Sequence, residues 1–305
     1  MGRFATNNYE DRFFEGRLTQ ATTRAEARWT NNEDFNLIVQ QFNESGPHMG
    51  KFDEDKGGIY PQEEIMSDAK WAKQFAERHD FESTQAKIEE AVAAENIFLE
   101  GVYSYEWFGP EVVATNTTRY DDYKSGIDAV VVHHDDDENI DFALGVDITV
   151  SSDPDVIDNK LAKSVEAVHH TVMSQDDAQK ALHHIKYFKD PETEKLGNLH
   201  VPRVVLAFDV EDTETLMKRF VEKDASIAND EIKKHLQYEV ISQLEVLVAE
   251  LIRKYLDNSF STQSDDWQSA IETHEAKIND IPGLRTVFNA HTKPLTYFSK
   301  IYKEN

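Results

Sequence analysis

The chain has 305 residues, of which 39% are hydrophobic, and its 32 Lys and Arg against 58 Asp and Glu give a formal net charge of −26. This length suits one large domain or a core domain with helical additions, and the charge disfavours a broad basic surface of the kind that binds nucleic acid through phosphates. The absence of Cys excludes a disulfide framework and thiolate metal sites. Without a long apolar run or a signal-peptide pattern, we expect a cytoplasmic protein that does not enter the membrane.

The N-terminal part of the chain has helical periodicity. Apolar side chains recur at helical spacing over 31–44 and 62–79, and a Gly- and Pro-punctuated linker separates these segments. We therefore expect residues 1–82 to form a mostly helical region with a loosely held start.

The next predicted helix, over 83–100, carries an acid on its apolar face. Ile88, Val92 and Leu99 follow the spacing of a buried face, and Glu95 falls on that face. An ionised carboxylate facing a core is costly unless it has a partner. Glu95 is therefore either a salt-bridged residue at a helix edge or a functional acid.

Residues 126–152, "GIDAVVVHHDDDENIDFALGVDITVSS", predict two apolar strands joined by an acidic turn. With the midpoint of the turn between Asp137 and Glu138, Asp128 lies opposite Asp147. The same register pairs two further sets of residues, Val130 with Gly145 and Val132 with Ala143. It also predicts one strongly apolar face, made of Ile127, Ala129, Val131, Phe142, Leu144, Val146 and Ile148.

Two aspartates in facing apolar strands need an explanation, because like charges directly opposite each other destabilise a sheet. A divalent cation between Asp128 and Asp147 would supply it, and oxygen ligands without Cys favour Mg²⁺ or Mn²⁺. Two structural alternatives remain open. The acids could lie at a sheet margin open to water, or they could pair with Lys124 or Arg119.

The rest of the chain alternates helix and strand patterns. We predict a helix at 154–168 capped by Asp153 and followed by strands at 183–188 and 202–210, then a long amphipathic helix at 229–257, a last helix near 264–279 and an aromatic tail. The fold class is therefore α/β (α+β), a mixed β-sheet flanked by helices. The expected organisation is an α/β core over 83–260 and a helical C-terminal extension over 261–305.

This order of elements, from the helix with Glu95 through "GIDAVV" and "LGVDITVS" to the helix with "IDNKLAKS", resembles the PD-(D/E)XK nuclease superfamily over roughly residues 83–210. The resemblance implies a restriction-endonuclease-like sheet and a Mg²⁺ site made by a helix acid and two strand acids. Here these acids correspond to Glu95, Asp128 and Asp147, with the Ile148 carbonyl as a further ligand.

The sequence departs from that superfamily at one position. The superfamily usually places a catalytic lysine two residues after the second-strand acid, where this chain has Thr149. A lysine from a neighbouring element can substitute, and we expect Lys160 to do so, with Lys163 as second choice. Asp121 and Asp122 either supplement the metal site or cap a turn, and the turn is the favoured role.

The remaining motifs give little support for other kinds of functional site. The three adjacent His pairs, at 133–134, 169–170 and 183–184, are poorly placed for chelation because neighbouring side chains diverge. No phosphate-binding Gly-rich loop, nucleophile elbow or HExxH motif occurs. Gln237 and Gln243 fall on the buried face of the long helix, where packing is favoured over a nucleotide contact.

The sequence thus predicts a Mg²⁺- or Mn²⁺-dependent phosphodiester hydrolase acting on nucleic acid. Its expected substrate contacts are small basic clusters at 186–189, Arg203 and 253–255. The alternative is a catalytically inactive protein with the same core, which serves as an acidic binding or interaction module.

Overall fold

The computed structural model describes residues 59–79, 85–135, 137, 139–151, 153–170, 181–229, 231–260, 266–281 and 283–304. The helix expected over 31–44 lies outside these residues. The helices are α4 (Gln62–His79), α5 (Gln85–Tyr105), α6 (Arg119–Ser125), α7 (Pro154–His170), α9 (Val210–Val221), α10 (Glu231–Tyr255), α11 (Trp267–Thr273), α12 (Glu275–Asp280) and α13 (Leu284–Glu304), with a 3₁₀ turn at Ala225–Asn229. The strands are β1 (Val112–Asn116), β2 (Ala129–His134), β3 (Ile140–Val150), β4 (His183–Lys189), β5 (Leu196–Val201) and β6 (Arg203–Phe208).

The strands form a mixed four-stranded sheet in the order β1-β2-β3-β6 and a separate β4–β5 hairpin. β1, β2 and β3 pair antiparallel, whereas β6 runs parallel to β3. A parallel pair needs a long crossover, and here the crossover contains α7 and the hairpin. The predicted mixed sheet flanked by helices is confirmed.

The predicted register of β2 and β3 is confirmed over most of its length, because Val130 pairs with Gly145 and Val132 with Ala143. The ladder ends at Ala129, so Asp128 lies just before the strand. The prediction for Ile127 was wrong, since it packs with Val130 and Val132 on the opposite face. Regular alternation begins only at Ala129, and the chain enters from the end of α6 rather than from an extended segment.

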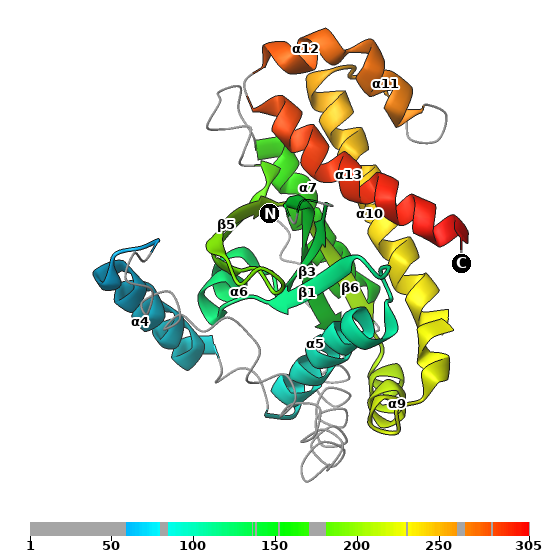
Figure 1. Cartoon of the computed structure of the whole chain (residues 1–305). Helices are drawn as coiled ribbons and strands as arrows, with labels where there is room; N and C mark the ends of the chain where they lie inside the picture. The colour runs from blue at the N-terminus through cyan, green and yellow to red at the C-terminus, as the bar shows by residue number, and fades with distance from the viewer. Residues whose placement is uncertain are drawn as a thin grey trace, which may run out of the picture.

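Helices cover one face of the sheet and the β4–β5 hairpin covers the other. On the first face, α5, α10 and α13 contribute to one large apolar core, and α10 and α13 lie side by side (Figure 1). On the second face, Ile185, Phe188 and Val201 of the hairpin pack against β2. Because both faces are covered, β2 and β3 can be apolar at nearly every position.

The later part of the chain is more helical than the sequence indicated. The expected aromatic tail is the long helix α13, and the helix expected near 264–279 is two short helices, α11 and α12. Helix α4 matches its predicted bounds. Helix α13 packs against both α10 and β3, while the proposed division at residues 82 and 260 stays a prediction. In the described part of the chain, no helix is long and apolar enough to cross a membrane.

The open edge of the sheet is covered by a side chain of α10. β6 is the last strand of the sheet, so one side of its backbone has no strand partner. The Gln243 amide replaces that partner: it accepts a hydrogen bond from the Val205 N–H at 2.7 Å and donates to the Val205 carbonyl at 2.6 Å. Gln237 donates to the Trp107 carbonyl at 2.6 Å, which confirms structural roles for both glutamines.

Replacing Gln243 with alanine is therefore expected to lower the free energy of unfolding by about 1–3 kcal/mol, because two backbone groups lose their partners. Urea denaturation of the wild type and of Gln243→Ala measures the loss. Glu245→Ala, at an exposed position on the same helix, is the control and should change stability by no more than about 0.5 kcal/mol. Equal effects of the two substitutions would contradict the edge-capping role.

Candidate functional site: an acidic cluster at the ends of β2 and β3

The short helix α6 sets the position of Asp128. Thr118 caps its N-terminus, and Gly126 ends it in the left-handed conformation, with φ of 63° and an N–H bonded to the Asp122 carbonyl. Only glycine adopts this conformation without strain, and it turns the chain directly into the approach to β2. Asp128 then accepts a hydrogen bond on Oδ2 from the Ile148 N–H at 2.6 Å. Asp128 is therefore fixed against β3 although it lies before β2.

Asp147 lies on β3 and is buried, with both carboxylate oxygens bonded to cations. Its Oδ1 accepts a hydrogen bond from Lys160 Nζ at 2.6 Å, and its Oδ2 accepts one from the Arg203 guanidinium. The Lys160 side chain is 29% exposed, whereas that of Arg203 is 4% exposed. The lysine thus connects the buried acid to the surface, and the arginine holds it from within.

Arg203 connects three elements around Asp147. Its Nε donates to the Gly126 carbonyl at 2.9 Å, and its Nη1 donates to the Lys160 carbonyl at 3.2 Å and to Ser164 Oγ at 3.3 Å. One side chain on β6 therefore fixes the end of α6, the middle of α7 and the carboxylate on β3. Arg203 is not free to contact a substrate, so that prediction was wrong.

Two further acids, Asp122 of α6 and Glu95 of α5, surround the same point. Burial and the charges of Glu95, Asp122 and Asp147 raise the pKa of Asp128 well above its ordinary range. Burial raises the pKa of Asp122 to about 6, while a hydrogen bond with Asp128 opposes that rise. The structure therefore brings together Glu95, Asp122, Asp128, Asp147 and Lys160, whereas Asp121, which the sequence also offered, bonds to β4.

The carboxyl group of Glu95 has a strongly raised pKa. Burial is the main cause that raises its pKa to about 8, and the charge of Asp122 adds to it, while Arg119 and Lys160 oppose it. In the described part of the chain no hydrogen bond to its carboxylate is found. Among the described residues, Glu95 therefore does not form the salt bridge that was the alternative to a functional role. With a pKa of about 8, its carboxyl group carries a proton near neutral pH.

The neighbouring acids Asp121 and Asp122 have different roles. Asp121 is buried and accepts hydrogen bonds from the Lys186 N–H at 2.7 Å and the Tyr187 N–H at 3.0 Å, so it ties α6 to β4. Asp122 instead contributes to the cluster. Helical periodicity could have placed these two residues on different faces of α6, but no helix was predicted at this position.

The other predicted substrate contacts are held within the protein. Lys186 pairs with Glu64 and Asp68 of α4 at 2.5 Å each, and Lys189 pairs with Glu194. In the third cluster, Lys254 donates to a backbone carbonyl at 2.6 Å, and Arg253 does so at 2.9 Å. These basic residues stabilise the fold instead of presenting free positive charge.

The acids are close but do not form a coordination sphere. Among the described residues, no three His, Cys, Asp or Glu side chains are arranged so that they could hold a metal ion. Both oxygens of Asp147 are bonded to Lys160 and Arg203, and Asp128 Oδ2 is bonded to Ile148. A divalent cation would have to replace some of these contacts. The donor chemistry still fits Mg²⁺, because the ligands are carboxylates, and the Ile148 carbonyl points to the same side as its N–H.

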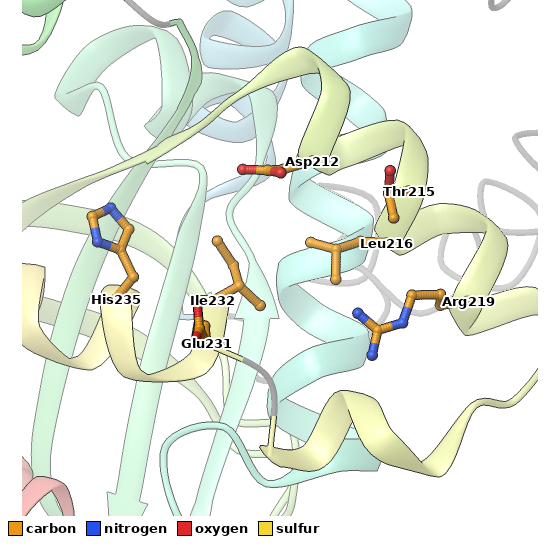
Figure 2. A pocket seen from close by; sticks show the side chains of 7 residues that line it. All are labelled: Asp212, Thr215, Leu216, Arg219, Glu231, Ile232 and His235. Carbon is orange, nitrogen blue, oxygen red and sulfur yellow. The ribbon is translucent and has the colours of Figure 1, made fainter.

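The described residues also line cavities away from the acidic cluster. One, of about 520 Å³, lies between α9 and α10 and is lined by Asp212, Thr215, Leu216, Arg219, Glu231, Ile232 and His235 (Figure 2). Its arginine already pairs with Asp224 at 3.0 Å. Another, of about 600 Å³, lies between α11, α13 and Asp141. None of the four acids lines either cavity, so neither belongs to the acidic cluster.

Comparison of the chain with protein-family models, curated proteins and solved structures finds no match. A function for the acidic cluster therefore has to be inferred from the positions and contacts of its own residues.

The raised carboxyl pKa values predict how stability depends on pH. Glu95 has an ordinary pKa of 4.5 and a folded-state pKa of about 8, so between these values the folded chain binds more protons than the unfolded chain. Its contribution to stability is full below about pH 4.5 and is lost as the pH rises through about 8. Thermal unfolding in the presence of a chelator should show this loss.

The variant Glu95→Gln should flatten that part of the pH profile, because an amide does not titrate. The control is Glu245→Gln at an exposed position of α10, which should keep the wild-type slope. A Glu95→Gln profile parallel to that of the wild type would show that Glu95 does not carry the shifted proton.

Proposed function

We propose that this protein is a divalent-metal-dependent phosphodiester hydrolase that acts on nucleic acid, with Glu95, Asp122, Asp128 and Asp147 as its acidic cluster and Mg²⁺ or Mn²⁺ as its cofactor. One observation carries the proposal. The Lys160 ammonium lies 2.6 Å from Asp147, at the point where Asp128 meets β3, although Lys160 is on a different element. This is the arrangement that the PD-(D/E)XK resemblance implies for a chain with Thr149 in the usual lysine position.

The order of elements supports the same proposal. A helix with an acid precedes a mixed sheet, two acids lie at the adjacent ends of β2 and β3, and α7 follows with the lysine. Buried carboxylates in contact are unfavourable unless protons or cations neutralise them. Burial raises the pKa of Glu95 to about 8 and that of Asp128 well above its ordinary range, which supports neutralisation of the cluster by protons when no cation is bound.

In the proposed reaction, a bound Mg²⁺ supplies Lewis acidity toward a phosphoryl oxygen and toward the attacking water. Asp128, Asp147 and the Ile148 carbonyl would hold it, with Glu95 and Asp122 around them. Lys160, which is partly exposed, donates hydrogen bonds to the water or to the developing negative charge. Arg203 keeps Asp147 and α7 in place.

The experiment is a hydrolysis assay on single-stranded DNA, duplex DNA and RNA, with Mg²⁺, with Mn²⁺ and with a chelator. The wild type should cleave at least one substrate only when a metal is present. Asp128→Asn should lower the rate by at least about 10²-fold. The control is Asp137→Asn, in the exposed turn between β2 and β3, which should leave the rate unchanged.

A second candidate function is a non-catalytic interaction module. It is favoured by the bonds from Lys160 and Arg203 to both oxygens of Asp147, which give this buried carboxylate its partners without a metal. No cleavage of any substrate, or equal cleavage by the wild type and Asp128→Asn, would overturn the hydrolase proposal and favour this one.

A further inference from the structure

The β4–β5 hairpin presents two histidines directly opposite each other. His184 on β4 pairs with His200 on β5 in the antiparallel register, and both residues are exposed. Their imidazole rings stack with centroids 4.7 Å apart and an interplanar angle of 26°. These residues belong to different strands, so the sequence alone does not bring them together.

Hydrogen bonds to α6 hold the part of β4 that carries His184. The His184 carbonyl accepts a hydrogen bond from Ser125 Oγ at 2.7 Å, and the Lys186 N–H, further along the same strand, donates to Asp121 at 2.7 Å. Both bonds point from β4 toward α6. The strand that carries His184 is therefore fixed to α6 at His184 and at Lys186.

Both rings have nitrogen atoms available for a ligand. Burial and Lys186 lower the pKa of His184, and burial and His184 lower the pKa of His200, so both imidazoles are neutral at neutral pH. Within the described residues, neither ring makes a hydrogen bond to the protein. By contrast, the rings of His134, His274 and His291 are bonded to Asp190 or to backbone carbonyls.

We propose that the exposed rings of His184 and His200 turn out of their stack, so that one nitrogen of each faces the same point, and together chelate a divalent transition-metal ion of the Zn²⁺ class. Neutral imidazoles are preferred ligands of such ions, whereas Mg²⁺ prefers oxygen. No further His, Cys, Asp or Glu completes a three-residue site in the described part of the chain, so water fills the remaining positions. The ion cross-links β4 to β5, and since β4 packs on α6, it also stabilises the support of the acidic cluster.

Calorimetric titration with Zn²⁺ and thermal unfolding with and without Zn²⁺ test the proposal. The wild type should bind Zn²⁺, and His184→Ala and His200→Ala should each weaken the affinity by at least about tenfold, which is about 1.4 kcal/mol. The rise in Tm caused by Zn²⁺ should be lost in parallel, because the ion stabilises only the folded hairpin.

Two variants distinguish chelation by this histidine pair from ring stacking and from weak zinc binding at another histidine. His184→Phe keeps an aromatic ring against His200 but removes a ligand, so it should lose Zn²⁺ affinity and keep the Tm measured without zinc. The chain has 12 histidines, so His235→Ala, at an exposed position on α10, controls for weak binding elsewhere and should bind like the wild type. Wild-type affinity in the double variant His184→Ala/His200→Ala, or no Zn²⁺ binding by the wild type, would overturn the proposal.

The histidine pair and the acidic cluster bind different ions, so the two proposals stand or fall separately. Removal of the histidines should leave Mg²⁺ binding intact, and Asp128→Asn should leave Zn²⁺ binding intact. The failure of either proposal is therefore visible in its own titration.

Discussion

Replacing Lys160 with alanine is expected to lower the rate of phosphodiester hydrolysis by about 10²–10³-fold, the usual loss when one preorganised donor is removed from a transition state. The Mg²⁺ affinity should stay the same or rise. In the structure the Lys160 ammonium and a cation would compete for Asp147 Oδ1, so removal of the lysine frees that oxygen. The rate should therefore fall without a loss of Mg²⁺ affinity, whereas simple unfolding would lower both.

The matched control is Lys163→Ala, since Lys163 is exposed on the same helix and was the second choice from the sequence. Single-turnover hydrolysis and Mg²⁺ calorimetry on both variants separate the two lysines. Full activity of Lys160→Ala, or an equal loss in Lys163→Ala, would remove Lys160 from the proposed reaction.

The second large effect is expected on stability. Replacing Arg203 with methionine should lower the free energy of unfolding by about 3–5 kcal/mol, because Asp147 is left as a buried charge without its main partner. Arg203 is 4% exposed and also holds Gly126 and α7, so few surrounding groups can compensate. Urea denaturation monitored by circular dichroism measures the loss.

Two comparisons define the origin of that loss. The double variant Arg203→Met/Asp147→Asn should recover part of the stability, because it removes the unpaired charge as well. Arg285→Met breaks a surface pair with Glu275 and should cost no more than about 1 kcal/mol. If Arg203→Met behaves like Arg285→Met, the buried pair does not hold the site together.

Local patterns made much of the candidate site predictable. Strand alternation and the acidic turn indicate the β2–β3 register that brings Asp128 to Asp147. The phase of α7 placed Lys160 toward the sheet, and Asp153 caps that helix through a 3.0 Å bond to the Asp155 N–H, as predicted. Each of these signals lies within one or two neighbouring elements.

Long-range pairing is the reason that the rest could not be predicted. The partnership of Arg203 with Asp147 depends on the parallel alignment of β6 with β3, which no local pattern specifies. The wrong face for Ile127 came from the left-handed turn at Gly126, because the apolar residues that follow this turn resemble the start of a strand.

The helix α13 shows a different kind of omission. Val287, Phe288 and Phe298 are buried on a helix that contains Pro294, whereas the sequence was interpreted only as an aromatic tail. Here the helical spacing of the buried residues was present in the sequence, but no helix was predicted from it.

The most direct measurement is a calorimetric titration of the wild type and of Asp128→Asn with Mg²⁺, in two buffers of different ionisation enthalpy. We expect the wild type to bind Mg²⁺ with release of protons, because Glu95, with a pKa of about 8, must lose its proton when the ion binds. Asp128→Asn should show no binding. If the wild type takes up no Mg²⁺, or if the variant binds it equally well, the acidic cluster is a proton-neutralised structural feature and not a metal site.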